Sequence, residues 1–393
     1  MAKTNCGFWV ELWMMMMNIS IFNLQLRLQV KYRDMKCEDN SLSLHMAYKA
    51  LAGETIYRGQ TNSPGNKYNH LPGVTATTFS PKTPGAEVAE TLREEITGKN
   101  LIITGTSLGG LGAEVAHVLA RYTNLVIIAG PSDERQQLTI DSIKTDLPSA
   151  NVRKLILDLS SSDAIRAAAA EVNAYSEPIH VLINNAAAAM GPYKETKDSH
   201  ENQFSVDHLG HFLFTTLILP RIRAARSPSY SPRIINLSST AHRGAGVRLD
   251  DVSFDRGKAY KIMPAYAQAK TANILFTEEL AKRLKREGIL AYAVDPGLVR
   301  LSNYSHLDAH DKGDERRGEK LHDKITWKTP QEGISTHIVA AFDPSIKDHS
   351  GSYLADCQVH NESVAPHASD PALAEKLWTL SEELLGESFP ISP

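Results

Sequence analysis

The chain has 393 residues, enough for one large domain or two smaller ones, and its 42% hydrophobic and 22% charged content is ordinary for a soluble globular protein. A formal net charge of −3 gives no electrostatic basis for binding nucleic acid or an anionic membrane surface. The three cysteines are scattered and form no C-x-x-C pair, so neither a disulfide framework nor a zinc site is expected. We therefore predict an intracellular, cytoplasmic protein without a metal site.

Residues 1–83 are predicted to be an N-terminal extension that is poorly structured or wraps the surface. Its stretch Phe8–Val30 is partly apolar, but residues such as Glu11 and Arg27 interrupt it, whereas a membrane-spanning helix needs ~20 mostly apolar residues. The stretch also lacks the basic start and the small-residue cleavage site of a secretory signal. Membrane contact is therefore not expected, with an N-terminal anchor as the alternative.

Short apolar runs alternate regularly with helix-period segments after residue 84. This alternation is typical of βαβ units, which build a parallel sheet. We predict an α/β fold for residues 84–393, a single Rossmann-like, doubly wound parallel sheet with helices on both faces. The predicted strands are 101–103, 125–129, 154–157, 179–183, 233–237 and 289–294, and the predicted helices include 111–121, 204–219 and 266–286.

A glycine-rich turn follows the first predicted strand. Thr104 and Gly105 end the strand, and Gly110, Leu111 and Gly112 open the next helix. Glycine lets the backbone approach a pyrophosphate closely, and a helix N-terminus offers N–H groups to an anion. Because open parallel sheets bind ligands at the carboxyl ends of their strands, this turn is predicted to hold a nucleotide.

Two later strand ends carry polar residues that fit the same site. Asp158 follows the third predicted strand, where its carboxylate can accept a hydrogen bond from an adenine amino group. Asn184 and Asn185 follow the fourth, where amide side chains can tie neighbouring strand ends together and frame a cofactor. Each signal is weak alone, and their order along the chain is what favours a nucleotide site.

Tyr266 and Lys270 are four residues apart on a predicted helix, so their side chains share one face about 5–6 Å apart. An ammonium beside a phenol favours the phenolate and lowers a pKa that is about 10 in an isolated tyrosine. Such a tyrosine can donate or accept a proton near neutral pH. Ser239 lies upstream at a predicted strand end, and Ser238 beside it should point the opposite way.

This ordered set resembles the short-chain dehydrogenase/reductase superfamily over about three quarters of the chain. The shared motifs are a glycine turn at Thr104–Gly112, N-N-A at Asn184–Ala186, a serine at 239, Y-x-x-x-K at Tyr266–Lys270 and P-G at 296–297. Two further segments, 208–212 and 272–277, resemble the retinol-dehydrogenase-like branch, which is also common among fungal tailoring reductases of secondary metabolism.

The resemblance implies an NAD(P)(H)-dependent oxidoreductase that interconverts an alcohol and its ketone or aldehyde by hydride transfer. It assigns Tyr266 as the acid/base and Lys270 as the residue that holds the nicotinamide ribose and tunes Tyr266. It assigns Ser239 as the donor that polarises the substrate oxygen, and Val299 as a backbone contact to the nicotinamide carboxamide.

Several residues depart from the family pattern. The glycine turn has one extra residue, and Ala187 replaces a glycine, which requires a negative φ there. Asp207 stands where the family has an asparagine that helps relay protons to the lysine, so its charge is expected to keep Lys270 protonated. The threonine expected shortly after 296–297 is absent. A non-catalytic nucleotide-binding sensor or scaffold of the same fold is therefore the alternative function.

The cofactor is predicted to be NADP, with NAD as the alternative. An NAD enzyme places an acid at the tip of the second strand, whereas an arginine suits the 2′-phosphate of NADP. The segment Ala129–Arg135 has no acid at the tip itself, and Arg135 lies close behind it. The expected partners are a small-molecule carbonyl or alcohol, no nucleic acid, and a second copy of the chain through the apolar helix 204–219.

Overall fold

One eight-stranded sheet organises the part of the chain that the computed structural model describes, residues 79–188, 190–301 and 326–391. The strand order is β3-β2-β1-β4-β5-β6-β7-β8. Strands β1 to β7 pair in parallel, and β8 pairs antiparallel with β7. The strands are β1 Asn100–Thr104, β2 Leu125–Gly130, β3 Val152–Ile156, β4 Val181–Asn184, β5 Arg233–Leu237, β6 Leu290–Asp295, β7 Tyr353–Ala355 and β8 Gln358–Val359.

The central strands are almost wholly apolar because helices cover both faces of the sheet. Every residue of β1, β2, β4 and β5 is buried. The order of the strands reverses between β1 and β4, and in open α/β sheets the crevice outside the carboxyl ends at such a reversal binds the ligand. The predicted fold, a doubly wound parallel sheet with helices on both faces, is confirmed.

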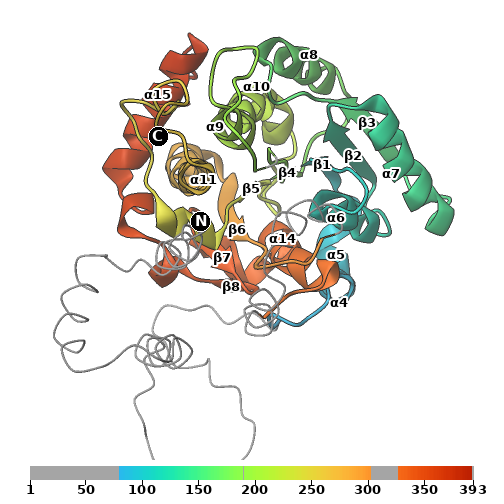
Figure 1. Cartoon of the computed structure of the whole chain (residues 1–393). Helices are drawn as coiled ribbons and strands as arrows, with labels where there is room; N and C mark the ends of the chain where they lie inside the picture. Colours follow the sequence, from blue (N-terminus) through green and yellow to red (C-terminus); the bar gives the residue numbers. More distant parts are fainter. Residues whose placement is uncertain (1–78, 189, 302–325, 392–393) are drawn as a thin grey trace, which may run out of the picture. The chain divides into compact units, whose positions relative to one another are not determined.

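Two helical layers enclose the sheet (Figure 1). One apolar core lies between the sheet and α4, α5, α6, α7 and α14, and the other lies between the sheet and α8, α10 and α11, with α15 packed against α11. The α-helices are α4 Gly85–Thr91, α5 Arg93–Ile96, α6 Leu111–Leu119, α7 Asp133–Asp146, α8 Ser162–Asn173, α9 Asn202–Phe204, α10 Gly210–Arg223, α11 Ile262–Leu284, α14 Pro330–Phe342 and α15 Pro371–Leu385. Shorter turns are the π-helical η2 Ser205–Leu209 and the 3₁₀ segments η3 Thr240–Gly244, η4 Lys285–Glu287, η6 Pro344–His349, η7 Asn361–Ser363 and η8 Pro366–Ala368.

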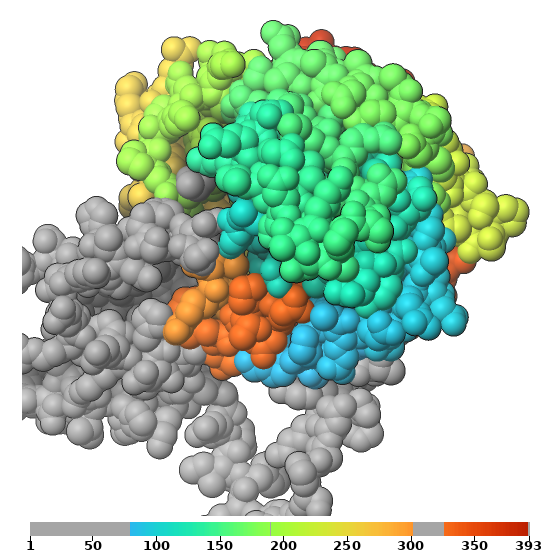
Figure 2. All heavy atoms as spheres, turned by 90° about the vertical axis from the view of Figure 1, so that its right-hand side faces the viewer, coloured from blue at the N-terminus to red at the C-terminus, as the bar shows by residue number. Residues whose placement is uncertain are grey.

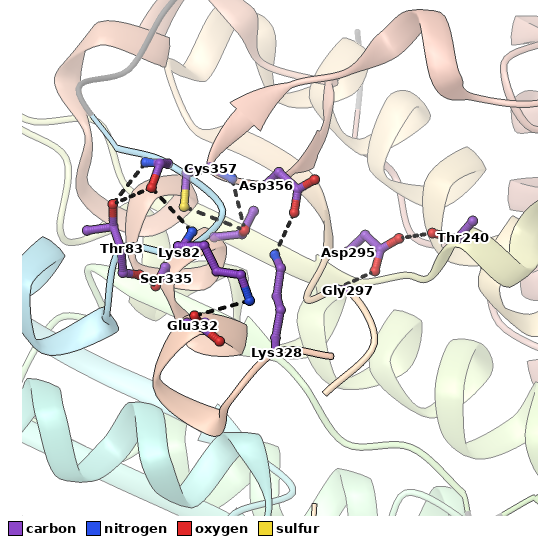
Figure 3. A network of polar contacts seen from close by, with 12 residues as sticks. Lys82, Thr83, Thr240, Asp295, Gly297, Lys328, Glu332, Ser335, Asp356 and Cys357 are labelled. Atoms are coloured by element: carbon purple, nitrogen blue, oxygen red, sulfur yellow. Dashed lines mark hydrogen bonds and ion pairs between the residues drawn. The ribbon is translucent and has the colours of Figure 1, made fainter. Parts of the chain in front are cut away.

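The segment just before α4 is part of the folded domain. Phe79 is buried in the core, and its carbonyl accepts a hydrogen bond from Gln358 Nε2 at 3.1 Å. Lys82 Nζ lies 3.3 Å from a Glu332 carboxylate oxygen of α14 (Figure 3). Figure 2 shows the blue atoms of this N-terminal part of the domain beside the orange atoms of α14. The domain predicted from residue 84 therefore includes at least the five residues before it, and the prediction for residues 1–78 lies outside the described residues.

Within the described ranges, no helix combines the length and the apolar character needed to cross a membrane. The predicted behaviour of Phe8–Val30 lies outside these ranges.

The apolar helix predicted at 204–219 is three consecutive elements, α9, η2 and α10. Almost all of α10 is buried within one chain: it packs against α8, and Phe212 contacts Trp378 of α15 and Phe389 edge-on. The apolar faces that led to the prediction of a helix-mediated homodimer are thus covered by the chain's own C-terminal part. A homodimer stays a prediction, without support from this helix.

Arg233 at the start of β5 connects the sheet to the end of α14. The residue is 7% exposed, and its guanidinium donates to the carbonyls of Ala340 at 3.0 Å and Asp343 at 2.9 Å. These carbonyls belong to the last turn of the helix and its cap, which have no partner within the helix. The side chain therefore satisfies two helix-end acceptors that would otherwise be buried without a donor.

We expect Arg233→Met to lower the free energy of unfolding by about 2–4 kcal/mol, because both carbonyls lose a charged donor. Urea unfolding followed by circular dichroism measures the change. The matched control is Arg223→Met, which removes a half-exposed arginine paired with Glu287 and should cost less than about 1 kcal/mol. Equal losses in the two variants would contradict the role given to Arg233.

Candidate active site

The residues singled out from the sequence converge on the carboxyl edge of the central strands. Thr104 ends β1, Asn184 ends β4, and Ser238 and Ser239 directly follow β5. Asp295 ends β6 and precedes the P-G motif. Because the carboxyl ends of parallel strands meet at one edge, these residues from distant parts of the sequence border a single crevice at the strand-order reversal.

The glycine turn accommodates its additional residue as a tight turn. The Gly110 N–H donates to the Ser107 carbonyl at 3.1 Å, and Gly109 between them has a φ of +78°, which glycine adopts readily. Gly110 is the N-cap of α6 and supplies no side-chain cap, so the first N–H groups of the helix remain for another acceptor. The insertion therefore leaves the helix entry intact.

Two glycines of this turn lie too close to their neighbours for any side chain. A Cβ on Gly105 would lie 2.6 Å from Ala186 Cα, and a Cβ on Gly112 would lie 2.5 Å from Asn185 Nδ2. The turn is therefore pressed against the segment that follows β4. Only glycine permits this close packing of the turn against the neighbouring segment.

Thr104 fixes the junction of β1 and β4. Its Oγ1 accepts the N–H groups of Asn185 and Ala186, both at 2.9 Å, and Asn185 Nδ2 donates to the Thr104 carbonyl at 2.8 Å. Thr104 Oγ1 also lies 2.8 Å from His211 Nε2, and His211 Nδ1 lies 3.0 Å from the Asp207 carbonyl. A carbonyl only accepts, so Nδ1 carries the proton and Thr104 donates to Nε2. Burial lowers the His211 pKa to about 4, which keeps the ring neutral.

Ala187, which replaces a family glycine, is not among the residues with positive φ. The substitution therefore brings no backbone strain at this position.

Lys270 and Asp207 form a buried ion pair at the centre of the site. Lys270 Nζ lies 2.8 Å from Asp207 Oδ2 and 5.3 Å from the centre of the Tyr266 ring, and the two charged residues are 2% and 0% exposed. Lys270 also donates to the Leu237 carbonyl at 3.4 Å, and Asp207 Oδ1 accepts the Ala188 N–H at 2.7 Å. The aspartate thus contacts the lysine directly.

The π-helical turn η2 brings Asp207 to this position. A π turn inserts one residue into a helix and redirects the side chains within it, and such turns are frequent at functional sites. Burial raises the pKa of the Asp207 carboxyl, whereas the Lys270 ammonium and the Ala188 N–H oppose the rise. With an ammonium at 2.8 Å, we interpret the couple as an ion pair.

The two adjacent serines point in different directions, as strand alternation predicts. Ser238 is buried, and its hydroxyl donates to the Lys270 carbonyl at 2.9 Å. Ser239 is partly exposed, and its Oγ accepts the Ala241 N–H at 3.2 Å, which leaves the hydroxyl hydrogen for donation. Ser239 is therefore the serine that can serve a ligand, and Ser238 positions the lysine backbone.

Asp158 follows β3 and Val299 follows β6, so both lie in segments that leave the carboxyl edge of the sheet. Val299 is 8% exposed and forms a parallel bridge with Lys328, which closes the loop after the P-G motif at its base. A Cβ on Gly333 of α14 would lie 2.5 Å from a Val299 methyl group, so Val299 is packed tightly on α14. Asp158 Oδ1 accepts the N–H and the hydroxyl of Ser160, at 3.0 and 2.6 Å.

The tip of β2 carries no acid. The strand ends at Gly130, and Ser132 caps α7 by accepting the Arg135 N–H at 3.3 Å. Asp133, the first acid after the tip, lies 2.6 Å from Lys154 Nζ of β3, and Arg135 is exposed.

Sequence reasoning missed two charged residues that support this site. Lys328 Nζ lies 2.6 Å from an Asp356 carboxylate oxygen, and the lysine stem covers Gly297 (Figure 3). No motif marks Lys328, which lies about thirty residues from Gly297 in sequence. Asp295 did carry a signal, since an acid at a strand end directly precedes the P-G motif.

Comparisons with known proteins agree with this geometry. Residues 99–312 match the family model described as short chain dehydrogenase. The chain is 37% identical over 301 residues to retinol dehydrogenase 12 of Bos taurus, covering 74% of this chain and 88% of the relative. It is 35% identical over 288 residues to polyprenol dehydrogenase of Homo sapiens, covering 72% and 84%.

Among solved structures, the crystal structure of an uncharacterized protein from Mycobacterium paratuberculosis is similar, with a TM-score of 0.56 and 28% identity. The match covers 75% of this chain and 96% of that chain.

We expect Lys270→Met to lower the free energy of unfolding by about 3–5 kcal/mol at pH 8, because it leaves the Asp207 carboxylate buried without a counter-charge. The loss should shrink as the pH falls to 5. The folded-state pKa of Asp207 is raised, so the carboxyl takes up a proton more readily in the folded than in the unfolded chain, and the variant gains stability as pH falls.

Urea unfolding at pH 5 and pH 8 measures both effects. The matched control is the double variant Asp207→Asn/Lys270→Met, which removes both charges and should lack the pH dependence. A Lys270→Met loss that is the same at both pH values would show that Asp207 and Lys270 are not an ion pair.

Proposed function

The chain belongs to the short-chain dehydrogenase family, and from this premise we propose that it is an NADP(H)-dependent oxidoreductase that interconverts an alcohol and its ketone or aldehyde. The sequence identities confirm the predicted resemblance to the retinol-dehydrogenase-like branch. The observation that carries the proposal is the buried Lys270–Asp207 ion pair beside Tyr266, at the carboxyl edge next to the glycine turn.

The residues around the crevice fit a nicotinamide dinucleotide. Gly105 and Gly112 let the turn pack closely on the segment after β4, and α6 begins without a side-chain cap, so its first N–H groups are available to an anion. We propose that Thr104, Gly105, Gly110, Leu111 and Gly112 hold the pyrophosphate side, with Asp158 at the adenine. Asn185 frames the cofactor, Lys270 holds the nicotinamide ribose, and Val299 contacts the carboxamide. When bound, the cofactor supplies or accepts the hydride.

We propose NADP over NAD because no carboxylate stands at the tip of β2. Asp133, which follows the tip, already faces the Lys154 ammonium at 2.6 Å and is less able to accept from ribose hydroxyls. Arg135 is exposed on the first turn of α7, within the segment that faces a 2′-phosphate in such folds.

In the proposed mechanism, Tyr266 transfers the proton that accompanies hydride transfer. The Tyr266 hydroxyl donates to the carbonyl oxygen in reduction and accepts the proton back in oxidation. Ser239 donates a hydrogen bond to the same oxygen and stabilises the charge that develops there. Lys270 lies within reach of the Tyr266 ring, and Asp207 holds the ammonium in place while neutralising part of its field.

We propose an apolar alcohol or carbonyl compound as the substrate. Two of the relatives are named retinol dehydrogenase and polyprenol dehydrogenase. In this chain, Ile262 at the start of α11 is 41% exposed, and Leu298 beside Val299 is 52% exposed. Large apolar side chains left open on two elements that border the site favour an apolar ligand.

Tyr266→Phe should lower NADPH-dependent reduction of a panel of apolar ketones and aldehydes by about 10²–10⁴-fold, because the proton donor is removed. The dissociation constant for NADPH, measured by fluorescence, should stay within about threefold, since the ring remains. The matched control is Tyr122→Phe at the opposite end of α6, where the hydroxyl bonds Glu90. Equal rates in wild type and Tyr266→Phe would refute the catalytic assignment, and wild-type binding without turnover would favour a sensor or scaffold.

Asp207→Asn should shift the pH at which alcohol oxidation reaches half its maximal rate downward by about one unit, because the Lys270 ammonium then acts on Tyr266 without an opposing carboxylate. The pH dependence of kcat/KM between pH 6 and 10 measures the shift. The matched control is Glu279→Gln, which removes another buried carboxylate of the α11 region that pairs with Arg283. An unchanged profile in Asp207→Asn would show that its charge does not influence the proton transfer.

A further inference from the structure

Asp295 is a buried carboxylate to which the proposed mechanism gives no role. It ends β6 and is 4% exposed. Its Oδ1 accepts the Gly297 N–H at 2.7 Å, and its Oδ2 accepts the hydroxyls of Thr240 at 2.5 Å and Tyr353 at 2.8 Å. Three neutral donors thus converge on one carboxylate (Figure 3 shows Asp295, Thr240 and Gly297).

The three donors come from three different elements. Gly297 begins the loop that carries Val299, Thr240 directly follows Ser239 in η3, and Tyr353 begins β7. Gly297 has a φ of +79°, so its N–H reaches the carboxylate through a backbone conformation that other residues rarely adopt. Asp295 therefore connects the cofactor-side loop with the serine turn across the end of β6.

The Ser239 side of this connection is held firmly. His242 Nδ1 lies 2.7 Å from the Ser239 carbonyl, and His242 Nε2 accepts the Ala365 N–H at 3.2 Å. Nδ1 therefore carries the proton and donates to the carbonyl. Burial lowers the pKa of His242 to about 4, so the ring stays neutral at working pH. The Ser239 carbonyl thus contacts His242, and the next residue, Thr240, contacts Asp295.

The Val299 side is held at its far end by Lys328. The Lys328 N–H donates to the Leu298 carbonyl at 2.8 Å, and the Arg300 N–H donates to the Lys328 carbonyl at 3.1 Å. The Lys328 ammonium in turn faces Asp356 at 2.6 Å (Figure 3). Asp295 thus contacts Gly297 before Val299, and Lys328 contacts Leu298 and Arg300 on either side of Val299.

We propose that Asp295 is a positioning residue that couples the cofactor loop to the catalytic serine, so that occupation of the Val299 loop orders the Ser239 turn. The inference rests on the proposed function, because Val299 and Ser239 face the two reacting partners only in that assignment. Hydride transfer needs the cofactor and the substrate to be held within about 0.5 Å of their productive positions. A carboxylate that contacts both the Val299 loop and the serine turn is a direct way to set the distance between them.

The Tyr353 bond to the same oxygen provides an internal comparison. Burial raises the pKa of Tyr353 well above its ordinary value and the Asp295 carboxylate adds to the rise, so its hydroxyl remains a donor. Tyr353 stabilises Asp295 as Thr240 does, but it belongs to β7 and not to the serine turn. Removing the Tyr353 hydroxyl therefore removes a donor to the carboxylate alone, whereas removing the Thr240 hydroxyl also removes the contact with the serine turn.

Hydrogen exchange of the full chain with and without NADPH tests the coupling without requiring turnover. In the wild type, NADPH should slow amide exchange at both Gly297–Arg300 and Thr240–Gly244 by about fivefold or more. In Asp295→Ala and Thr240→Val the slowing at Thr240–Gly244 should fall below about twofold, while the glycine turn remains protected. Asp295→Asn keeps an acceptor for Gly297 and should show part of the slowing at Thr240–Gly244. Tyr353→Phe should show the full slowing there.

The proposal would be overturned if NADPH still protected the amides of Thr240–Gly244 in Asp295→Ala. It would also be overturned if Tyr353→Phe lost this protection as completely as Thr240→Val. Because this measurement follows binding, a wild type that shows the coupling but reduces no carbonyl compound would refute the proposed function and leave the coupling standing.

Where the wild type turns over, steady-state kinetics provides the second arm. Asp295→Ala and Thr240→Val should each lower kcat by about 10-fold or more, and the double variant should be no slower than Asp295→Ala alone, because both remove one interaction. Tyr353→Phe should change kcat by less than about threefold. Additive losses in the double variant would contradict a shared path through Asp295.

Discussion

The buried ion pair of Lys270 and Asp207 is the interaction on which the rest of the site depends. Two charges with almost no exposure are costly to remove from water, and the cost is recovered only when their geometry is good and their remaining hydrogen-bonding atoms are satisfied. The chain meets both conditions, since the ammonium also faces the Leu237 carbonyl and the carboxylate accepts the Ala188 N–H. The pair therefore connects β5, the loop after β4 and α11 at the point where Tyr266 is placed.

The parallel sheet brings residues that are far apart in the sequence to one edge. Thr104, Asn185 and Ser239 are far apart in the chain, yet each follows a strand whose carboxyl end lies on the same edge. The close approach of Gly105 and Gly112 to the segment after β4 leaves no room for a side chain at either glycine. The fold thus supplies the positions, and the residue types at the strand ends supply the chemistry.

Most of the fold and of the motif residues could be predicted from the sequence, because apolar periodicity and strand-end residues are local signals. β7 and β8 were not predicted, since they have three and two residues and only tertiary pairing defines them. The direct contact of Asp207 with Lys270 depends on the π turn η2, which could not be predicted from the residue pattern. The apolar excess of α10 was interpreted as an interface because α15, more than 140 residues later, covers it only in three dimensions.

The site places its two buried carboxylates under opposite electrostatic conditions, and this difference bears on which ligand it suits. Asp207 is balanced by an ammonium, so the pair adds little net charge beside Tyr266. Asp295 accepts hydrogen bonds from three neutral donors, one in the serine turn, one in the P-G loop and one in β7. A neutral carbonyl or alcohol group is therefore not repelled from the reacting centre, whereas an anionic group close to Asp295 would be. In the proposed function, the phosphates of a dinucleotide lie at the glycine turn and the N-terminus of α6, where backbone N–H groups favour negative charge.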